Sequence, residues 1–89
     1  MKIKNTYVLR NVAGAWVVLP LSDQMLDFNG MLKLNDSAVL LWRALEQGSD
    51  RETLVTLLTE KYEISYQQAL ADVDEFIHRL QQANCLESI

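Results

Sequence analysis

The arrangement of apolar and polar positions changes character near Asn35. Before Asn35, β-branched and aromatic residues come in short runs, and after it apolar residues recur at the spacing of amphipathic helices. Residues 6–10 and 15–19 are typical of strands, and residues 11–14 between them, with Gly14 as the turn-forming residue, predict a hairpin. Strands that precede helices, rather than alternating with them, indicate an α+β domain.

A third strand is predicted at residues 31–34, directly after an Asn-Gly turn signal. Within it Leu32 and Leu34 share one face. Pro20 lacks an N–H, so the second strand is expected to end there or to be unpaired at that position. Residues 22–27 have no clear period and are predicted to form a loop.

Three helices are predicted in the second part of the chain. Asn35 is the expected N-cap of the first helix, whose apolar residues recur at i, i+3, i+4 and i+7 from Ala38 to Leu45. Gly48 follows this apolar stripe, and we expect it to close the helix in a left-handed conformation.

Capping boxes mark the starts of the other two helices. Ser49 with Glu52 and Ser65 with Gln68 have the required spacing. The buried face of the longest helix is predicted to contain Tyr66, Leu70, Val73, Ile77 and Leu80, with Phe76 on its flank. Asn84 is the expected stop, after which the chain is predicted to fold back onto the core.

Length and hydropathy indicate a small globular protein. The 89 residues are predicted to form one domain, 1–89, because domains of this size have a single core. No apolar run reaches the roughly 20 residues of a membrane span, and Gly14 and Pro20 interrupt the longest one. The N-terminus lacks the pattern of a secretory signal, so we expect a cytoplasmic protein without membrane contact.

The net charge of −4 argues against nucleic acid as a ligand. Three helices with a short sheet is the layout of a winged helix-turn-helix, whose third helix enters DNA. Here that helix carries Asp72, Asp74 and Glu75, which phosphates would repel. An acidic winged-helix transcription regulator, or another protein-interaction module, remains the alternative interpretation.

The sequence contains no recognisable catalytic or cofactor motif. Its glycines are isolated, so no phosphate-binding loop is predicted, and we expect no cofactor, no metal and no enzymatic activity. Cys85 is the only cysteine and His78 the only histidine. We expect Cys85 to be a small apolar residue at a helix end and His78 to lie on the surface. A small redox or catalytic protein that uses both is a third alternative.

The remaining candidate is a binding surface made of backbone groups. An edge strand presents unpaired N–H and carbonyl groups to which a peptide can add as a further strand. Residues 31–34, beside the longest helix, are the natural candidate, and replacing Leu32 with proline is expected to remove a donor from that ladder. The alternatives are that residues 22–27 cover this edge or that a second copy of the chain pairs with it as a homodimer.

Several segments resemble the PqqD family. The segment 28–38, followed by Leu41-Trp42, is similar to the family's strand that ends in Leu-Asn and leads into a helix with an apolar-Trp pair. Residues 54–62 are similar to its second helix, and the Asp-Val at Asp72 to its third. The resemblance extends over nearly the whole chain.

This resemblance implies a winged helix-turn-helix fold with a three-stranded antiparallel sheet followed by three helices, known as a RiPP recognition element. It also implies a chaperone that binds the leader of a ribosomally made precursor peptide and presents it to a separate enzyme, often a radical-SAM maturase. The leader would add beside the third strand, against the third helix. The implied peptide-binding residues are Met31, Leu32, Lys33, Leu34, Asp72, Glu75, Phe76 and Arg79.

Overall fold

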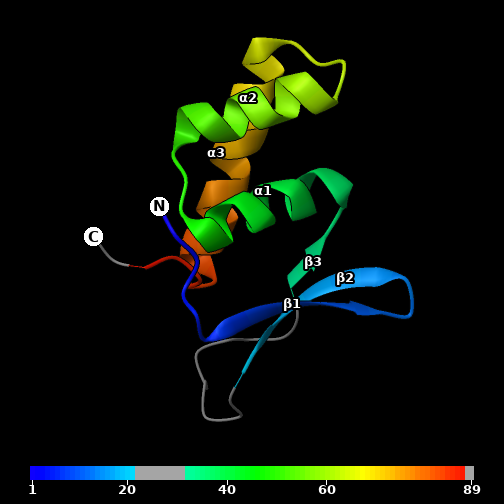
Figure 1. Ribbon diagram of the computed structural model, residues 1–89, viewed down its shortest axis with the longest axis vertical. Helices are drawn as coiled ribbons and strands as arrows, with labels where there is room; N and C mark the ends of the chain where they lie inside the picture. The colour runs from blue at the N-terminus through cyan, green and yellow to red at the C-terminus, as the bar shows by residue number, and fades with distance from the viewer. Residues whose placement is uncertain (22–31, 88–89) are drawn as a thin grey trace.

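A computed structural model describes residues 1–21 and 32–87, in which an antiparallel sheet lies against three helices (Figure 1). The sheet has the strand order β1-β2-β3, so β1 and β3 are its edges. The predicted strand and helix order is therefore confirmed. The elements are β1 (Tyr7–Val12), β2 (Ala15–Pro20), β3 (Leu32–Leu34), α1 (Asp36–Gln47), α2 (Arg51–Lys61) and α3 (Tyr66–Gln82). The predicted loop at residues 22–27, the Asn-Gly turn and Met31 lie outside the described residues.

The turn between β1 and β2 is tighter than the sequence predicted. Only Ala13 and Gly14 form it, with φ angles of 53° and 86°, and the strands extend to Val12 and from Ala15. Two consecutive positive φ angles are typical of a turn whose twist matches that of the strands. Asn11 supports the turn because its Oδ1 accepts a hydrogen bond from the Gly14 N–H at 3.1 Å.

Two of the three predicted N-caps are confirmed. The Asn35 side chain accepts from the Ala38 N–H at 2.9 Å, and Ser65 accepts from the N–H three residues further along at 3.1 Å. The prediction for α2 was wrong, because Asp50 rather than Ser49 accepts from the first turn of that helix. The Ser49 N–H and carbonyl both bond to Met1, so pairing with the N-terminus holds Ser49 outside the helix.

Gly48 ends α1 differently from the expected cap. Its φ of 92° is positive as predicted, but its ψ of 130° is outside the left-handed helical region. The Gly48 N–H donates to the Leu45 carbonyl at 3.2 Å. The extended ψ leads the chain to the position where Ser49 meets Met1.

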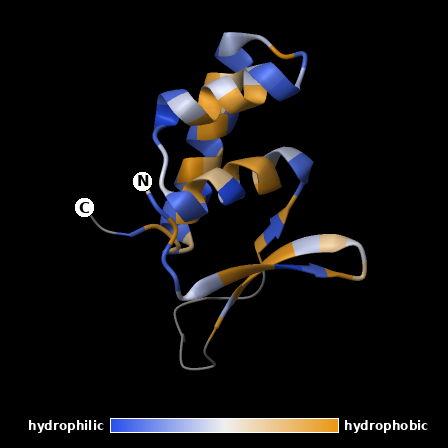
Figure 2. Ribbon diagram, in the orientation of Figure 1, coloured by the Kyte–Doolittle hydropathy of each residue, from blue (hydrophilic) through white to orange (hydrophobic). Residues whose placement is uncertain are grey.

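One apolar core joins the sheet to all three helices. Trp42, Leu45, Leu54, Leu80 and Val18 are fully buried in it. Figure 2 shows the alternation of apolar and polar residues along the helices and the hairpin that this packing requires.

The buried face of α3 is rotated relative to the prediction. Tyr66 is 52% exposed, and its hydroxyl donates to the Glu52 carboxylate. The buried residues are Ala69, Val73, Phe76 and Leu80, which also have helical spacing. Leu70 and Ile77 are only partly buried against the core, so the predicted stripe lies at the flank of the observed one.

The two ends of the described chain are clasped together. Ile3 and Leu86 form an isolated antiparallel bridge, and the Lys4 N–H donates to the Cys85 carbonyl at 2.8 Å. Asn84, with a φ of 60°, turns the chain back after α3, which confirms its predicted role as a stop. Among the described residues, no helix combines the length and the hydrophobicity that crossing a membrane requires.

Candidate functional site

Lys33 is the residue of β3 whose backbone groups face the free edge of the sheet. The Leu21 N–H donates to the Thr6 carbonyl at 2.8 Å, which fixes the alternation of bonded pairs between β1 and β2. By this alternation the backbone groups of Val17 bond to β1. Those of Trp16 and Val18 face β3, opposite Leu34 and Leu32. Since Lys33 lies opposite Val17, its N–H and carbonyl point away from β2.

The same register corrects the role expected of Leu32. Leu32 pairs with Val18, and the backbone N–H and carbonyl groups of these two residues face each other. The Leu32 N–H therefore belongs to the ladder between β2 and β3. A proline there would damage the sheet rather than remove a donor from its free edge. Pro20, opposite Tyr7, does not interrupt the bonds between β1 and β2, and it ends β2 as predicted.

Arg79 reaches this free edge from α3. Its Nη2 donates to the Lys33 carbonyl at 3.1 Å, which agrees with the outward direction of that carbonyl. The Arg79 side chain is half-buried, and no carboxylate of the described residues lies within ion-pair distance of it. One edge carbonyl of β3 is therefore bonded to a cation held by a neighbouring helix.

Three hollows share lining residues, and we call them together the β3–α3 trough, although only the first of them is lined by β3 itself. The hairpin hollow, about 520 Å³, is lined by residues including Gly14, Trp16, Lys33, Asp36 and Arg79. The central hollow, about 180 Å³, is lined by residues including Ser37, Leu58, Asp72, Glu75, Phe76 and Arg79. The α2 hollow, about 360 Å³, is lined by residues including Asp36, Ser37, Leu58, Tyr62, Ile64 and Asp72.

The trough brings together part of the set of residues implied by the family resemblance. Lys33 and Arg79 meet at the strand edge, and Asp72 and Glu75 lie exposed beside the central hollow. Phe76 lines that hollow but is only 4% exposed, so most of its surface belongs to the core.

The leucines of β3 point into the protein. Leu34 is buried at 6% exposure, and Leu32 is half-buried against the core. Because their backbone groups face β2, neither leucine offers a free backbone group to a peptide. Met31 lies outside the described residues, and its role stays a prediction.

Sequence reasoning missed several residues that line the trough. Asn35 lines all three hollows, Leu58 lines two of them, and Trp16 lines the hairpin hollow. The sequence assigned Asn35 as a helix cap, and Leu58 lies within the segment 54–62 that was assigned to the second helix. No local signal indicates that the start of α1 and the end of α2 meet beside α3.

The acidic residues of α3 fall into different environments. Asp74 makes two hydrogen bonds to Arg51 of α2, at 2.7 and 2.8 Å, and this pairing lowers the pKa of the Asp74 carboxyl below its ordinary value. Asp72 accepts a hydrogen bond from Gln68, one turn earlier. Asp72, Asp74 and Glu75 are all exposed, and their charge disfavours contact with nucleic-acid phosphates.

Cys85 and His78 do not form a common site. Cys85 is fully buried, and loss of hydration raises the pKa of its thiol to about 11, far from the value of a reactive nucleophile. His78 is exposed on α3. Within residues 1–21 and 32–87, no group of three acidic, histidine or cysteine side chains is placed to hold a metal ion.

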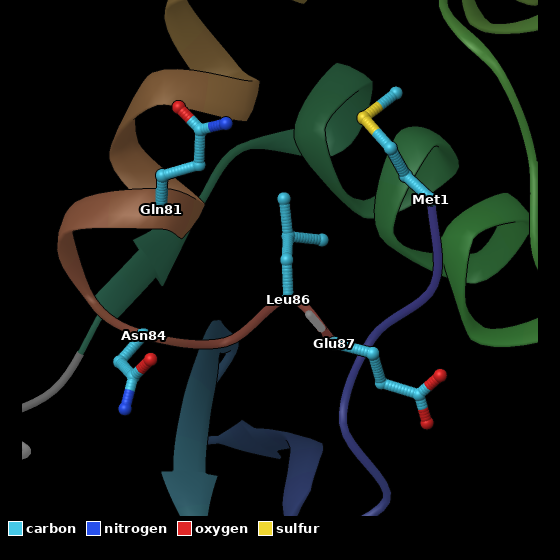
Figure 3. Close-up of a pocket in the computed structure, with 5 residues that line it drawn as sticks. All are labelled: Met1, Gln81, Asn84, Leu86 and Glu87. Atoms are coloured by element: carbon cyan, nitrogen blue, oxygen red, sulfur yellow. The ribbon is translucent and has the colours of Figure 1, made fainter. Parts of the chain in front are cut away.

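A separate hollow of about 330 Å³ lies beside the clasped chain ends (Figure 3). Figure 3 shows the Leu86 side chain pointing into the space between Gln81 and Met1, while Asn84 points away from it. The strand-like segments at this place already bond to each other through Ile3 and Leu86. This hollow therefore lacks the free strand edge that distinguishes the trough.

Comparison with known proteins reveals one matching family and two similar structures. Residues 15–86 match the sequence profile of the family described as coenzyme PQQ synthesis protein D (PqqD). The structure of TbiB1 in complex with the TbiA(beta) leader peptide has a TM-score of 0.78 and 22% identity, covering 100% of this chain and 98% of that chain. A lasso peptide synthetase B1 complexed with the leader peptide has a TM-score of 0.76 and 18% identity, covering 98% and 96%. The predicted fold is confirmed. Comparison with curated protein sequences gave no match.

Proposed function

Because this chain belongs to the PqqD family, we propose that it is a non-catalytic adaptor for the leader of a ribosomally made precursor peptide. Residues 1–89 act as one peptide-binding domain, a RiPP recognition element. The leader adds to β3 as a further strand and is presented to a separate modifying enzyme.

The observation that carries this proposal is the outward direction of the Lys33 backbone at the edge of the sheet. A peptide residue opposite Lys33 can donate to its carbonyl and accept from its N–H, as in an ordinary antiparallel pair. The adjoining trough offers space for the side chains on either side of that residue. Backbone bonds then supply affinity, and the trough supplies selectivity.

The two similar structures support this interpretation, since both are complexes with a leader peptide. Their fold extends over almost the entire length of this chain. The modifying enzyme is a separate protein, for which the family resemblance implies a radical-SAM maturase. Burial of Cys85 and exposure of His78 support an adaptor that leaves the chemistry to that enzyme.

Titration with a synthetic leader peptide tests the proposal. The peptide is taken from a precursor gene adjacent to the gene for this chain, and a scrambled peptide of the same composition is the control. We expect a dissociation constant of about 1 μM or tighter by calorimetry. In NMR spectra the largest shifts should occur at the Lys33 amide and along the trough-facing side of α3.

Two results would contradict this assignment. Shifts confined to the hollow at the chain ends would place the peptide elsewhere on the molecule. Shifts of the Lys33 amide that depend on protein concentration, and not on peptide, would show that a second copy of the chain occupies the edge.

A further inference from the structure

Arg79 is placed differently from the other two arginines in the described helices. Arg43 pairs with Glu46 at 3.0 Å and Arg51 pairs with Asp74 at 2.7 Å. Arg79 is half-buried at the edge of β3, and its only recorded polar contact among the described residues is the Lys33 carbonyl. A positive charge is thus held at the candidate site without a carboxylate from the described part of the chain.

The guanidinium of Arg79 retains most of its hydrogen-bonding capacity. It has five N–H donors in a planar fork, and the bond to Lys33 uses one of them. A carboxylate matches two parallel N–H groups of such a fork, and this pairing is stronger than a bond between neutral groups. The chemistry of Arg79 therefore fits an acidic side chain.

The strand register indicates where that side chain would lie. On an added strand, the residue opposite Lys33 shares its exposed face, and the next residue points to the opposite face. That second face is the one of Leu32 and Leu34, which pack toward the core and the helices. Arg79 extends from a helix of that layer to the strand edge.

The charged residues that line the two hollows beside Arg79 determine from which side a peptide carboxylate can reach it. In the central hollow a peptide carboxylate would meet Asp72 and Glu75, which repel it. In the hairpin hollow it would meet Lys33 and Asp36, whose charges balance. An acidic side chain is therefore favoured to reach Arg79 from the hairpin side.

Building on the proposed function, we infer that Arg79 recognises an aspartate or glutamate of the bound peptide, next to the residue that pairs with Lys33. The Lys33 carbonyl has two lone pairs, so it can keep the Arg79 bond while accepting from the peptide N–H. Arg79 then joins the acidic side chain to the edge of the sheet. The preferred peptide has an extended segment with an acidic residue at one fixed position.

A displayed library of random peptides, long enough to cross β3 and the hairpin hollow, tests this inference. Peptides selected by the wild-type chain should share an acidic residue at one position, and those selected by Arg79→Glu should carry lysine or arginine there. A synthetic peptide with the acidic residue should bind Arg79→Glu at least about tenfold more weakly than the wild type. Exchanging that residue for lysine should restore binding to the variant.

Two further variants control for charge and folding. Arg10 is exposed on β1 and donates to the carbonyl of its neighbour Leu9, so Arg10→Glu changes the net charge equally without touching β3. It should retain the acidic preference. Arg79→Gln keeps a donor for the Lys33 carbonyl but lacks the charge, so it should lose the preference without gaining a basic one, even if Arg79→Glu folds poorly.

The possible failures are distinct. Selected peptides that shift the Lys33 amide but share no acidic position would overturn the role of Arg79 and leave the proposed function standing. An acidic preference that persists in Arg79→Glu would overturn it as well. A library from which no peptide binds at β3 would overturn both proposals.

Discussion

The two edges of the sheet are protected by arginines in different ways. On β1, Arg10 donates to the Leu9 carbonyl at 3.2 Å, from the neighbouring position of the same strand. On β3, Arg79 donates to the Lys33 carbonyl from a helix 46 positions away in the sequence. Both contacts cover an outward-facing carbonyl, which reduces the tendency of an edge to pair with other chains.

The difference lies in what surrounds each contact. Arg10 is exposed, and its contact is local to β1. Arg79 is held by α3 and lines two hollows, so space for incoming side chains exists on both sides of it. We infer that an edge strand becomes a selective binding site when a second element leaves space for side chains beside it. Four experiments test this comparison.

The largest effect is expected from Phe76→Ala, which removes packing between α3 and the rest of the core. Phe76 is 4% exposed, and deletion of a buried aromatic ring costs about 3–5 kcal/mol of unfolding free energy. Urea unfolding followed by circular dichroism measures this loss, with Phe76→Leu as the milder control. A loss below about 1 kcal/mol together with lost peptide binding would instead make Phe76 a contact residue.

Lys33→Pro is expected to weaken leader binding by about ten- to a hundredfold. The substitution removes the outward N–H of β3, and one lost hydrogen bond with a stranded partner costs about 1–3 kcal/mol. Asn11→Pro removes the outward N–H of β1 and also the Asn11 side-chain bond to Gly14, so Asn11→Ala, which removes that side-chain bond alone, accompanies it, and neither should weaken binding. Calorimetry compares the two proline variants, and Lys33→Ala separates the backbone effect from loss of the side chain. Equal losses for both prolines would mean that β3 is not the preferred edge.

A smaller change in unfolding free energy is expected when Arg10 or Arg79, which donate to carbonyls at the two edges of the sheet, is replaced. Arg79→Ala leaves the Lys33 carbonyl without its charged donor, and we expect a loss of about 1 kcal/mol. Arg10→Ala removes a contact between two adjacent residues of one strand, which joins no other element to the sheet, so its effect should stay within about 0.5 kcal/mol. Denaturant titrations of both variants give the comparison. A larger effect at Arg10 would reverse the ranking of the two edges.

The smallest effect at neutral pH concerns Cys85, which lies beside the segment that leads into β1. Its pKa is raised from 9.0 to about 11, so burial of the neutral thiol stabilises the fold below pH 9, and this contribution is lost as pH rises through about 11. At pH 8, iodoacetamide should react much more slowly with the native protein than with the urea-unfolded chain. Rapid native alkylation without loss of leader binding would show that the clasp opens independently of β3.

Much of the fold could be predicted because its signals are local. The caps at Asn35 and Ser65 depend on residues within one helical turn, and the strand runs have strong β propensity. The cap of α2 could not be predicted, because Ser49 is held by Met1, which is distant in sequence. The rotation of the α3 stripe likewise depends on which neighbour it packs against.

The candidate site was likewise predictable only where its features depend on local sequence. Periodicity indicated an edge strand near Lys33, but only the register shows which backbone groups point outward. The bond from Arg79 to Lys33 and the convergence of Asn35 and Leu58 on the trough arise from tertiary packing. Sequence patterns of single elements contain no information on these contacts.

The clasp of Ile3 with Leu86 also determines where the two ends of the described chain lie. It brings both ends of the described chain to one place, where Met1 bonds to Ser49 beyond the end of α1 (Figure 1). β3 enters the opposite end of that helix, whose 12 residues span about 18 Å. Met1 and Glu87, the two ends of the described chain, therefore lie in one region, about a helix length from the end of α1 that β3 enters.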